Sequence, residues 1–238
     1  MIVVWDRDRR STVPREEFIY RNMITTEDTI AYRISRVLAD RIVTGVLQPD
    51  TRLRQEHIAD EFGVSHVPVR EALRRLEAQG LAVSEARRGV RVASFNSAAV
   101  EEATRMRSVL EGLALRQATP HLTSHILDRA EAAARSCDQA SDIVQHEAAN
   151  RKFHSLLLTP CEMPRLLAEI DDLHMVGSRF LFLEGHMDFV APRFDADHHA
   201  VLQHLRSGNF DEAVRTLERH VLRLIEKRPR AITRLQTA

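Results

Sequence analysis

The chain has 238 residues, enough for one large domain or two modest ones. Apolar residues make up 44% and charged residues 29%, and only eight glycines and eight prolines occur, which excludes collagen-like and low-complexity chains. Lysine plus arginine and aspartate plus glutamate both number 34, so the net charge indicates no partner. No apolar stretch approaches the ~20 residues that span a membrane, and no disulfide framework is expected from the two cysteines. We expect a soluble, cytoplasmic, mainly α-helical protein.

The first part of the chain predicts a loose arm followed by two helices. Residues 1–25 mix charges with a proline and show no sustained hydrophobic period. From residue 26 apolar residues recur at helical spacing, which predicts a helix that ends at Gly45. A short second helix is expected over Gln55–Phe62, closed by Gly63 in the left-handed conformation.

A third helix and a β-hairpin are predicted next. Ser65 is the expected N-cap of the third helix, and Gly80 ends it. The following alternation of apolar and polar residues predicts two short strands joined by a turn that contains Gly89, with Val83 facing Val92. A helix, a helix–turn–helix and a hairpin, in this order, are typical of a winged helix.

The rest of the chain contains only segments with helical patterns. Six of them with short connections predict an antiparallel bundle, and Ser97 and Thr123 are the expected N-caps of the first two. The expected helices are 98–119, 124–138, 142–158, 164–184, 195–207 and 211–227. We place a domain boundary near Asn96, which gives an arm over 1–25, a winged helix-turn-helix domain over 26–95, an all-α domain over 97–230 and a tail over 231–238.

The third helix carries the residues expected to face a nucleic acid. Arg70 lies opposite its apolar stripe, and its N-terminus presents Ser65 and His66. Residues 65–91 hold six arginines against three glutamates, inside a chain that is neutral overall. Such a helix N-terminus fits a major groove of ~12 Å and can reach base edges or phosphates. A solvated helix face would have the same charges, so this pattern alone leaves both interpretations open.

Four residues among the later helices have the spacing of a metal site. Asn150 and His154 lie four residues apart and project from one helix face. His198 falls near the start of the next-to-last helix and His220 in the last. Three helices that converge in a bundle can supply three imidazoles and an oxygen, which suits a divalent transition metal.

The histidine pattern also permits other interpretations. Asp195 and His199 form a competing pair four residues apart, and a buried histidine is often simply hydrogen-bonded. Six further histidines have polar neighbours in the sequence and are interpreted as surface or capping residues: His121, His125, His146, His174, His186 and His204.

About fifty residues from Gly45 to Val92 resemble the DNA-binding domain of the GntR family of bacterial transcription regulators. The matching motifs are Gly45-x3-Pro49, Ile58-Ala59, Gly63-Val64-Ser65, Pro68-Val69-Arg70-Glu71-Ala72-Leu73, Gly80-Leu81 and Arg88-Gly89. The resemblance implies that one group of residues contacts the groove and another forms the wing: Ser65, His66, Val67 and Arg70 at the groove, Arg88 and Gly89 on the wing.

Residues 97–228 are similar to the FCD effector domain of the FadR subgroup. The matching motifs are Arg107-x2-Leu110-Glu111, Asn150-x3-His154, Asp197-His198 and Gly208-Asn209-x3-Ala213-x6-His220. In this family such residues hold a divalent cation, commonly zinc, with nickel and manganese as alternatives. The open positions of the cation accept the carboxylate of a small metabolite. The resemblance implies a metal site formed by Asn150, His154, His198 and His220.

One ligand departs from the family pattern. Asn150 stands where many relatives have aspartate, and its neutral amide compensates less of the cation's charge, which favours an anionic effector. Arg107 resembles the family's effector-facing cation, and Arg179 is a second candidate for contact with the effector carboxylate. An ion pair of Arg107 with Glu111, one turn further on, is the alternative.

These features predict a ligand-responsive, DNA-binding transcription regulator, with repression as its expected mode, and not an enzyme. The family implies a homodimer, which places two recognition helices ~34–36 Å apart on a pseudo-palindromic operator. A metal sensor, in which the cation itself is the signal, is an alternative. A metal-dependent enzyme is less favoured, because no carboxylate is clearly placed as a general base.

Overall fold

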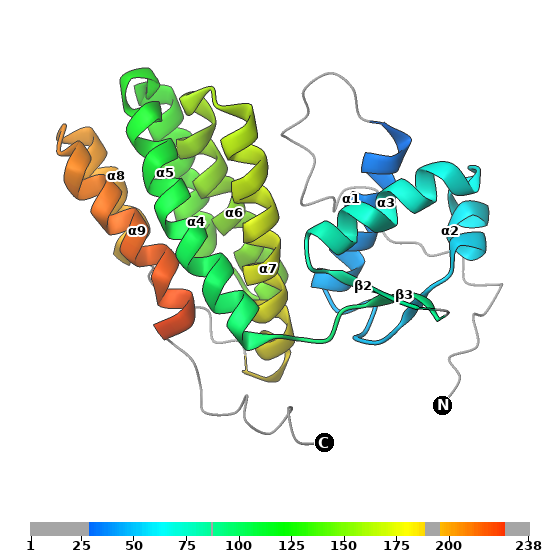
Figure 1. Cartoon of the computed structure of the whole chain (residues 1–238). Helices are drawn as coiled ribbons and strands as arrows, with labels where there is room; N and C mark the ends of the chain where they lie inside the picture. Colours follow the sequence, from blue (N-terminus) through cyan, green and yellow to red (C-terminus); the bar gives the residue numbers. More distant parts are fainter. Residues whose placement is uncertain (1–28, 87, 189–195, 227–238) are drawn as a thin grey trace.

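The computed structural model describes residues 29–86, 88–188 and 196–226, and only the backbone of residues 183–188 and 226. A winged helix and a helical bundle stand side by side, joined by an extended segment after the last strand (Figure 1). The predicted fold class is therefore confirmed. The expected arm over 1–25 and tail over 231–238 lie outside the described residues. The domain limits stay predictions.

The winged helix contains three helices and a small sheet. The helices are α1 (Ile30–Val43), α2 (Gln55–Phe62) and α3 (His66–Ala78). α2 has the predicted bounds, and Gly63 closes it with φ 64° and ψ 38°, the left-handed geometry that favours glycine. Ser65 is the N-cap of α3 as predicted, although its side chain makes no capping hydrogen bond.

The sheet has three strands in the order β1, β3, β2: β1 (Arg52–Leu53), β2 (Ala82–Glu85) and β3 (Gly89–Val92). β1 was not predicted, because two residues are too few to show a period of two. The hairpin was predicted, but its register was wrong by one residue. Val83 pairs with Arg91 and not with Val92, since Gly89 already pairs with Glu85 and shortens the turn.

Six helices form the bundle in the described residues: α4 (Ser97–Ala118), α5 (Ser124–Asp138), α6 (Ile143–Leu158), α7 (Pro164–Asp188), α8 (Ala196–Arg206) and α9 (Phe210–Glu226). α4, α5 and α6 agree with the prediction to within one residue, whereas α7 continues beyond its predicted end at residue 184. The N-cap of α4 is Asn96 and not Ser97, because the Asn96 side chain accepts from two backbone amides. Thr123 caps α5 as predicted.

Within the residues that the structure describes, two apolar clusters form the core, and α7 contributes to both. The buried stripe of α3, with Val69, Leu73 and Leu76, packs in the winged-helix cluster together with Met175 and Phe182 of α7. Burying each such side chain contributes ~1.5–3 kcal/mol. The winged helix is thus attached to the bundle through α7. Among the described helices, none has the length and apolar character needed to cross a bilayer.

Candidate metal centre and DNA-binding surface

Three of the four predicted metal ligands converge inside the bundle. His154 comes from α6, His198 from α8 and His220 from α9, and one nitrogen of each lies within 4.8 Å of the others. The Nε2 atoms of His198 and His220 are 3.1 Å apart. Two nitrogens bound to one tetrahedral zinc ion lie ~3.3 Å apart, given Zn–N distances of ~2.0–2.1 Å. The spacing therefore fits two ligands of one cation.

The two ring nitrogens of His154 differ in their hydrogen bonding. Its Nδ1 lies 2.6 Å from Oε2 of Glu111, and its buried Nε2 has no hydrogen-bond partner among the described residues. Burial lowers the pKa of His154. Burial raises the pKa of Glu111, but Arg107 and His154 outweigh it and hold this pKa below its ordinary value. A neutral imidazole therefore donates from Nδ1 to an ionised carboxylate and keeps a lone pair on Nε2.

Of the other two imidazoles, that of His220 also lies beside a carboxylate. Nδ1 of His220 is 3.6 Å from Oδ2 of Asp197, a carboxylate that also pairs with Nε of Arg223 at 2.9 Å. Burial, followed by the neighbouring imidazoles, lowers the pKa of His198. Metal-binding histidines are neutral and commonly donate their second nitrogen to a carboxylate, which fixes the ring. The three histidines therefore fit a divalent cation, with Glu111 and Asp197 orienting two of the rings.

Asn150, the fourth predicted ligand, lies on the same helix as His154, whereas His199 of the competing pair lies outside the histidine cluster. Asn150 is half-buried on α6, one turn before His154 and on the same face of the helix. His199 donates from Nε2 to Oδ2 of Asp138 at 2.9 Å and does not belong to the histidine cluster. Asp195 lies outside the described residues, so only His199 of the competing pair is located.

A second buried polar group adjoins the histidine cluster. Nε2 of His174 lies 2.6 Å from Oε1 of Glu147, and Ser178 donates to the same oxygen. Burial opposes ionisation of Glu147, but His174 and Ser178 lower its pKa to about 2. Burial and the charge of Arg107 lower the pKa of His174 to about 4. Within the described residues, Oε2 of Glu147 has no hydrogen-bond partner.

This group was not predicted from the sequence. His174 was interpreted as a surface or capping residue, but it is 4% exposed, so the interpretation is wrong. Its polar neighbours in the sequence concealed that α7 buries one face against α6. Two spacings could have indicated the group: Glu147 lies seven residues before His154, and His174 four residues before Ser178, so each pair shares a helix face.

The two arginines proposed as effector contacts lie in different places. Arg107 is 7% exposed, and its Nε donates to Oε1 of Glu111 at 2.6 Å, which is the alternative considered for it. Since Glu111 also holds His154, Arg107 is linked to the histidine cluster through one carboxylate. Arg179 donates from Nη2 to the carbonyl oxygen of Ala93, between the last strand and α4. A role of either arginine in effector binding stays a prediction.

The predicted groove-facing residues lie on the solvent side of α3. Ser65, His66, Val67 and Arg70 are exposed, while the opposite face of the helix is buried. Val67 is 56% exposed in the first turn of the helix. The C-terminal end of α3 approaches α7, and its N-terminal end points away from the bundle (Figure 1). The bundle therefore leaves this surface open.

The wing also presents its predicted residues to solvent. The Arg88 side chain is 75% exposed, and Gly89 has φ 84°, a conformation that side chains with a Cβ rarely adopt. Arg87 lies outside the described residues.

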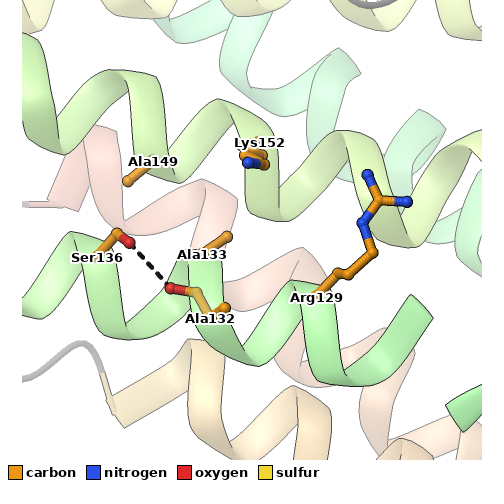
Figure 2. A pocket seen from close by; sticks show the side chains of 6 residues that line it. All are labelled: Arg129, Ala132, Ala133, Ser136, Ala149 and Lys152. Atoms are coloured by element: carbon orange, nitrogen blue, oxygen red, sulfur yellow. Dashed lines mark hydrogen bonds between the residues drawn. The ribbon is translucent and has the colours of Figure 1, made fainter. Parts of the chain in front are cut away.

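A surface hollow between α5 and α6 is separate from the histidine cluster (Figure 2). Lys152 of α6 lines it, two residues before His154, and two residues correspond to about 200° around a helix. The hollow therefore lies on the other side of α6. Its lining residues are Arg129, Ala132, Ala133, Ser136, Ala149 and Lys152.

Two family models match the chain. The model described as "Bacterial regulatory proteins, gntR family" matches residues 30–92, and the FCD domain model matches residues 102–223. The HTH-type transcriptional regulator YdhC of Bacillus subtilis strain 168 is 28% identical over 195 residues, which cover 78% of this chain and 83% of YdhC. A probable D-xylose utilization operon transcriptional repressor of Paenarthrobacter nicotinovorans is 28% identical over 204 residues, or 82% and 87% of the two chains.

Solved structures have the same fold. E. coli McbR/YncC superposes with a TM-score of 0.68 and 22% identity, covering 86% of this chain and 97% of that chain. A GntR family member from Pseudomonas syringae pv. tomato DC3000 has 30% identity and a TM-score of 0.51, covering 87% and 86%. From the two family models and these relatives, which are regulators and not enzymes, the chain belongs to the GntR family of DNA-binding transcriptional regulators and carries an FCD domain.

Proposed function

We propose that this regulator binds operator DNA as a homodimer, and that a small carboxylate metabolite controls this binding from a metal site in the bundle. The observation that carries the proposal is the convergence of His154, His198 and His220. The buried Nε2 of His154 has no hydrogen-bond partner in the part of the chain that the structure describes. Repression is the proposed mode, and the cytoplasm, where bacterial DNA lies, is the proposed location.

Zinc is the proposed cation, with nickel and manganese as alternatives. His154, His198 and His220 would hold it, with the amide oxygen of Asn150 as a fourth, neutral ligand. When bound, such a cation supplies a Lewis acid with open positions for a carboxylate. The second nitrogens of His154 and His220 face the carboxylates of Glu111 and Asp197, and this arrangement keeps the rings oriented.

The buried charges support an anionic effector. Beside the histidines, Glu111 and Glu147 are two buried carboxylates, and Arg107 is the buried guanidinium that acts on both. Arg179 is also buried, but it donates to the carbonyl oxygen of Ala93 and not to either carboxylate. With neutral imidazoles these charges sum to minus one, and a divalent cation would change the sum to plus one. Asp197 is balanced by Arg223 and leaves this sum unchanged. One carboxylate group of an effector would then restore neutrality in a region that water does not screen.

The exposed first half of α3 is the proposed groove-reading element. Arg70 offers a guanidinium to guanine or phosphate, Ser65 and His66 offer hydrogen bonds, and the exposed Val67 offers an apolar contact for a thymine methyl. The wing residues Arg88 and Gly89 are proposed to lie along the adjacent backbone or minor groove.

An exposed apolar stripe on α4 supports the homodimer. Met106, Val109 and Leu113 are 44%, 66% and 41% exposed on one face of this helix. Two copies of α4 that pack antiparallel about Val109 would cover the stripe, as a two-fold interface does. Glu102 and Arg116 each lie seven residues from Val109, so the same packing sets Glu102 of one copy opposite Arg116 of the other.

Control of DNA binding requires that the effector binds one arrangement of the winged helices better than another. Recognition helices on a two-fold dimer fit half-sites ~34–36 Å apart, and a change in their separation weakens operator binding. The proposed effector contacts are Arg107, through the carboxylate network, and Arg179, beside the segment that joins the two parts of the chain.

Zinc content and DNA affinity test this proposal together. Operator DNA is first selected from a random pool with the wild-type protein. Zinc binding and operator binding are then measured for the wild type, for His154→Ala with His220→Ala, and for the matched control His121→Ala with His125→Ala, which removes two exposed histidines. The first double variant should lose zinc and the control should keep it. Full zinc occupancy in the first variant would mean that other residues are the ligands.

The same titration separates the candidate functions. With zinc bound, acetate, lactate and citrate are added in turn, and a change in operator affinity for any of them supports carboxylate control. A change on addition of zinc alone, with no further change for these three acids, favours the metal sensor.

A further inference from the structure

Three polar contacts join the winged helix to the bundle in the described residues, and α7 takes part in each. Arg36 of α1 pairs with Asp171, and Nε2 of Gln79 donates to Oδ1 of Asp172 at 2.8 Å. Arg179 donates to the carbonyl oxygen of Ala93. The first two contacts come from neighbouring residues of α7 and reach different helices of the winged helix.

Asp171 is shared between the two parts of the chain. Its Oδ2 pairs with Arg36 of the winged helix, while its Oδ1 pairs with Arg151 of α6. The three side chains are only 12–21% exposed, so solvent screens these pairs less than it screens surface pairs. Burial raises the pKa of Asp40 on α1, and the charges of Arg36 and Arg151 oppose this rise. The carboxylate of Asp171 therefore links α1 and α6.

Arg151 belongs to the helix that carries the histidine cluster. It directly follows Asn150 and lies three residues before His154. A helix moves as a nearly rigid body, so a displacement of α6 that brings His154 or Asn150 onto a ligand also displaces Arg151. Helix shifts of ~1–2 Å are common in regulatory transitions. Such a shift is large compared with the tolerance of a charged hydrogen bond.

Arg36, the partner of Asp171 in the winged helix, is connected to the recognition helix α3 through Tyr32. The guanidinium of Arg36 lies 5.9 Å from the centre of the Tyr32 ring, and that of Arg75 lies 5.7 Å from the same ring. Arg75 is in the last turn of α3, and Gln79 is the C-cap of the same helix. The pair Asp171 and Asp172 therefore holds both α1 and the C-terminal end of α3.

We propose that Asp171 is a positioning residue that couples displacement of α6 to the placement of α1 and the recognition helix α3. This coupling rests on the proposed function for its biological use, because the cation and effector are the ligands expected to displace α6. The carboxylate acts through its two arginines and does not touch the cation, the effector or DNA.

Hydrogen–deuterium exchange of the full chain tests the coupling. The first arm uses no metal and compares Arg151→Gln in the wild-type background and in the Asp171→Asn background. If Asp171 couples α6 to α1 and α3, Arg151→Gln should change amide exchange in α1 and α3. The expected change is about fivefold or more, the lower end of typical coupling. Arg151→Gln should have no such effect once Asp171 is asparagine. Asp171→Glu should restore the effect, and Asp128→Asn, at an exposed carboxylate paired with Arg206, is the control.

The second arm adds zinc to the same proteins. In the wild type, exchange should change in α6, α8 and α9 and also in α1 and α3. In Asp171→Asn the change in α1 and α3 should be lost, while that in α6, α8 and α9 is kept.

The two arms separate the two hypotheses. An equal effect of Arg151→Gln in both backgrounds overturns the coupling, whatever zinc does. A positive first arm with no zinc response in α6, α8 and α9 supports the coupling and overturns the proposed metal site. A zinc response in α1 and α3 that persists in Asp171→Asn shows another route and overturns the role of Asp171.

Discussion

Glu111 accepts a 2.6 Å hydrogen bond from Nδ1 of His154, and this contact decides which nitrogen of the ring faces the other two histidines. The same carboxylate accepts a hydrogen bond from Arg107, so its charge is balanced without use of the imidazole proton. The Nε2 lone pair of His154 is therefore available in the neutral ring, which is the form that binds metal ions. The geometry of the site depends on a carboxylate that is not itself a predicted ligand.

Glu111→Gln should weaken zinc binding by about 10–100-fold, the usual effect of removing a partner that orients a ligand. The amide keeps the shape of the side chain but lacks the charge that holds both His154 and Arg107. Competition with a chelating dye measures the affinity. The control is Glu101→Gln on the same helix, whose carboxylate pairs with Arg105 at the surface. Equal zinc affinity of Glu111→Gln and the wild type would contradict the proposed orientation of His154.

Arg70→Ala should abolish specific operator binding while the fold is retained, because Arg70 is exposed and the opposite face of α3 carries the packing. A bidentate contact of arginine with guanine is worth about 1–3 kcal/mol of discrimination. Fluorescence anisotropy with the selected operator and with scrambled DNA measures the loss. Arg129→Ala, at the hollow on the bundle, is the control for general electrostatic effects. Binding like that of the wild type would contradict the groove assignment.

Val109→Glu should convert the dimer into a monomer, because it introduces a charge at the centre of the proposed interface, where its symmetry mate would lie close. Sedimentation should then give a mass near that of one chain, 27.2 kDa, in place of twice this value. Val144→Glu changes a valine that is 37% exposed on α6 and serves as the control. An unchanged sedimentation coefficient for Val109→Glu would place the interface elsewhere.

Local sequence signals predicted the helices well and the pairing of strands less well. α2 and its glycine cap follow from apolar spacing and from the need for a left-handed residue at Gly63, which are both local properties. The hairpin register depends on where Gly89 enters the ladder, and shifting it by one residue leaves the alternation of the strands unchanged. The cap of α4 at Asn96 was displaced by one residue, because Asn96 and Ser97 are both good capping residues.

In the site, too, local patterns predicted some residues, whereas contacts between distant residues were not predicted. The spacing of Asn150 and His154 and the family resemblance led to the histidines that the structure brings together. The Glu147–His174 pair joins residues 27 positions apart on two helices. Spacings within each helix indicate two faces, but the pairing of these faces depends on the packing of α6 against α7. The link through Asp171 has the same origin, since Arg36 lies 135 positions before it in the chain. Such long-range contacts leave no periodic trace in a single sequence.

Asn150→Asp tests the charge argument at the proposed fourth ligand. Aspartate adds a negative charge beside the cation, so zinc affinity should rise by about tenfold, which corresponds to about 1.4 kcal/mol. The same charge would remove the excess positive charge that an effector carboxylate is proposed to neutralise. Binding of citrate to the zinc-loaded protein should therefore weaken by a similar factor.

Two titrations measure these opposite changes: chelator competition for zinc, and calorimetry for citrate added to the zinc-loaded protein. Asn209→Asp, at an exposed asparagine before α9, introduces the same charge outside the cluster and should alter neither affinity. Unchanged zinc affinity in Asn150→Asp would show that this position is not a ligand. If zinc affinity rose without weaker citrate binding, the ligand role would stand. The account of why the site selects an anion would then be wrong, because the added charge would have left the affinity for citrate unaffected.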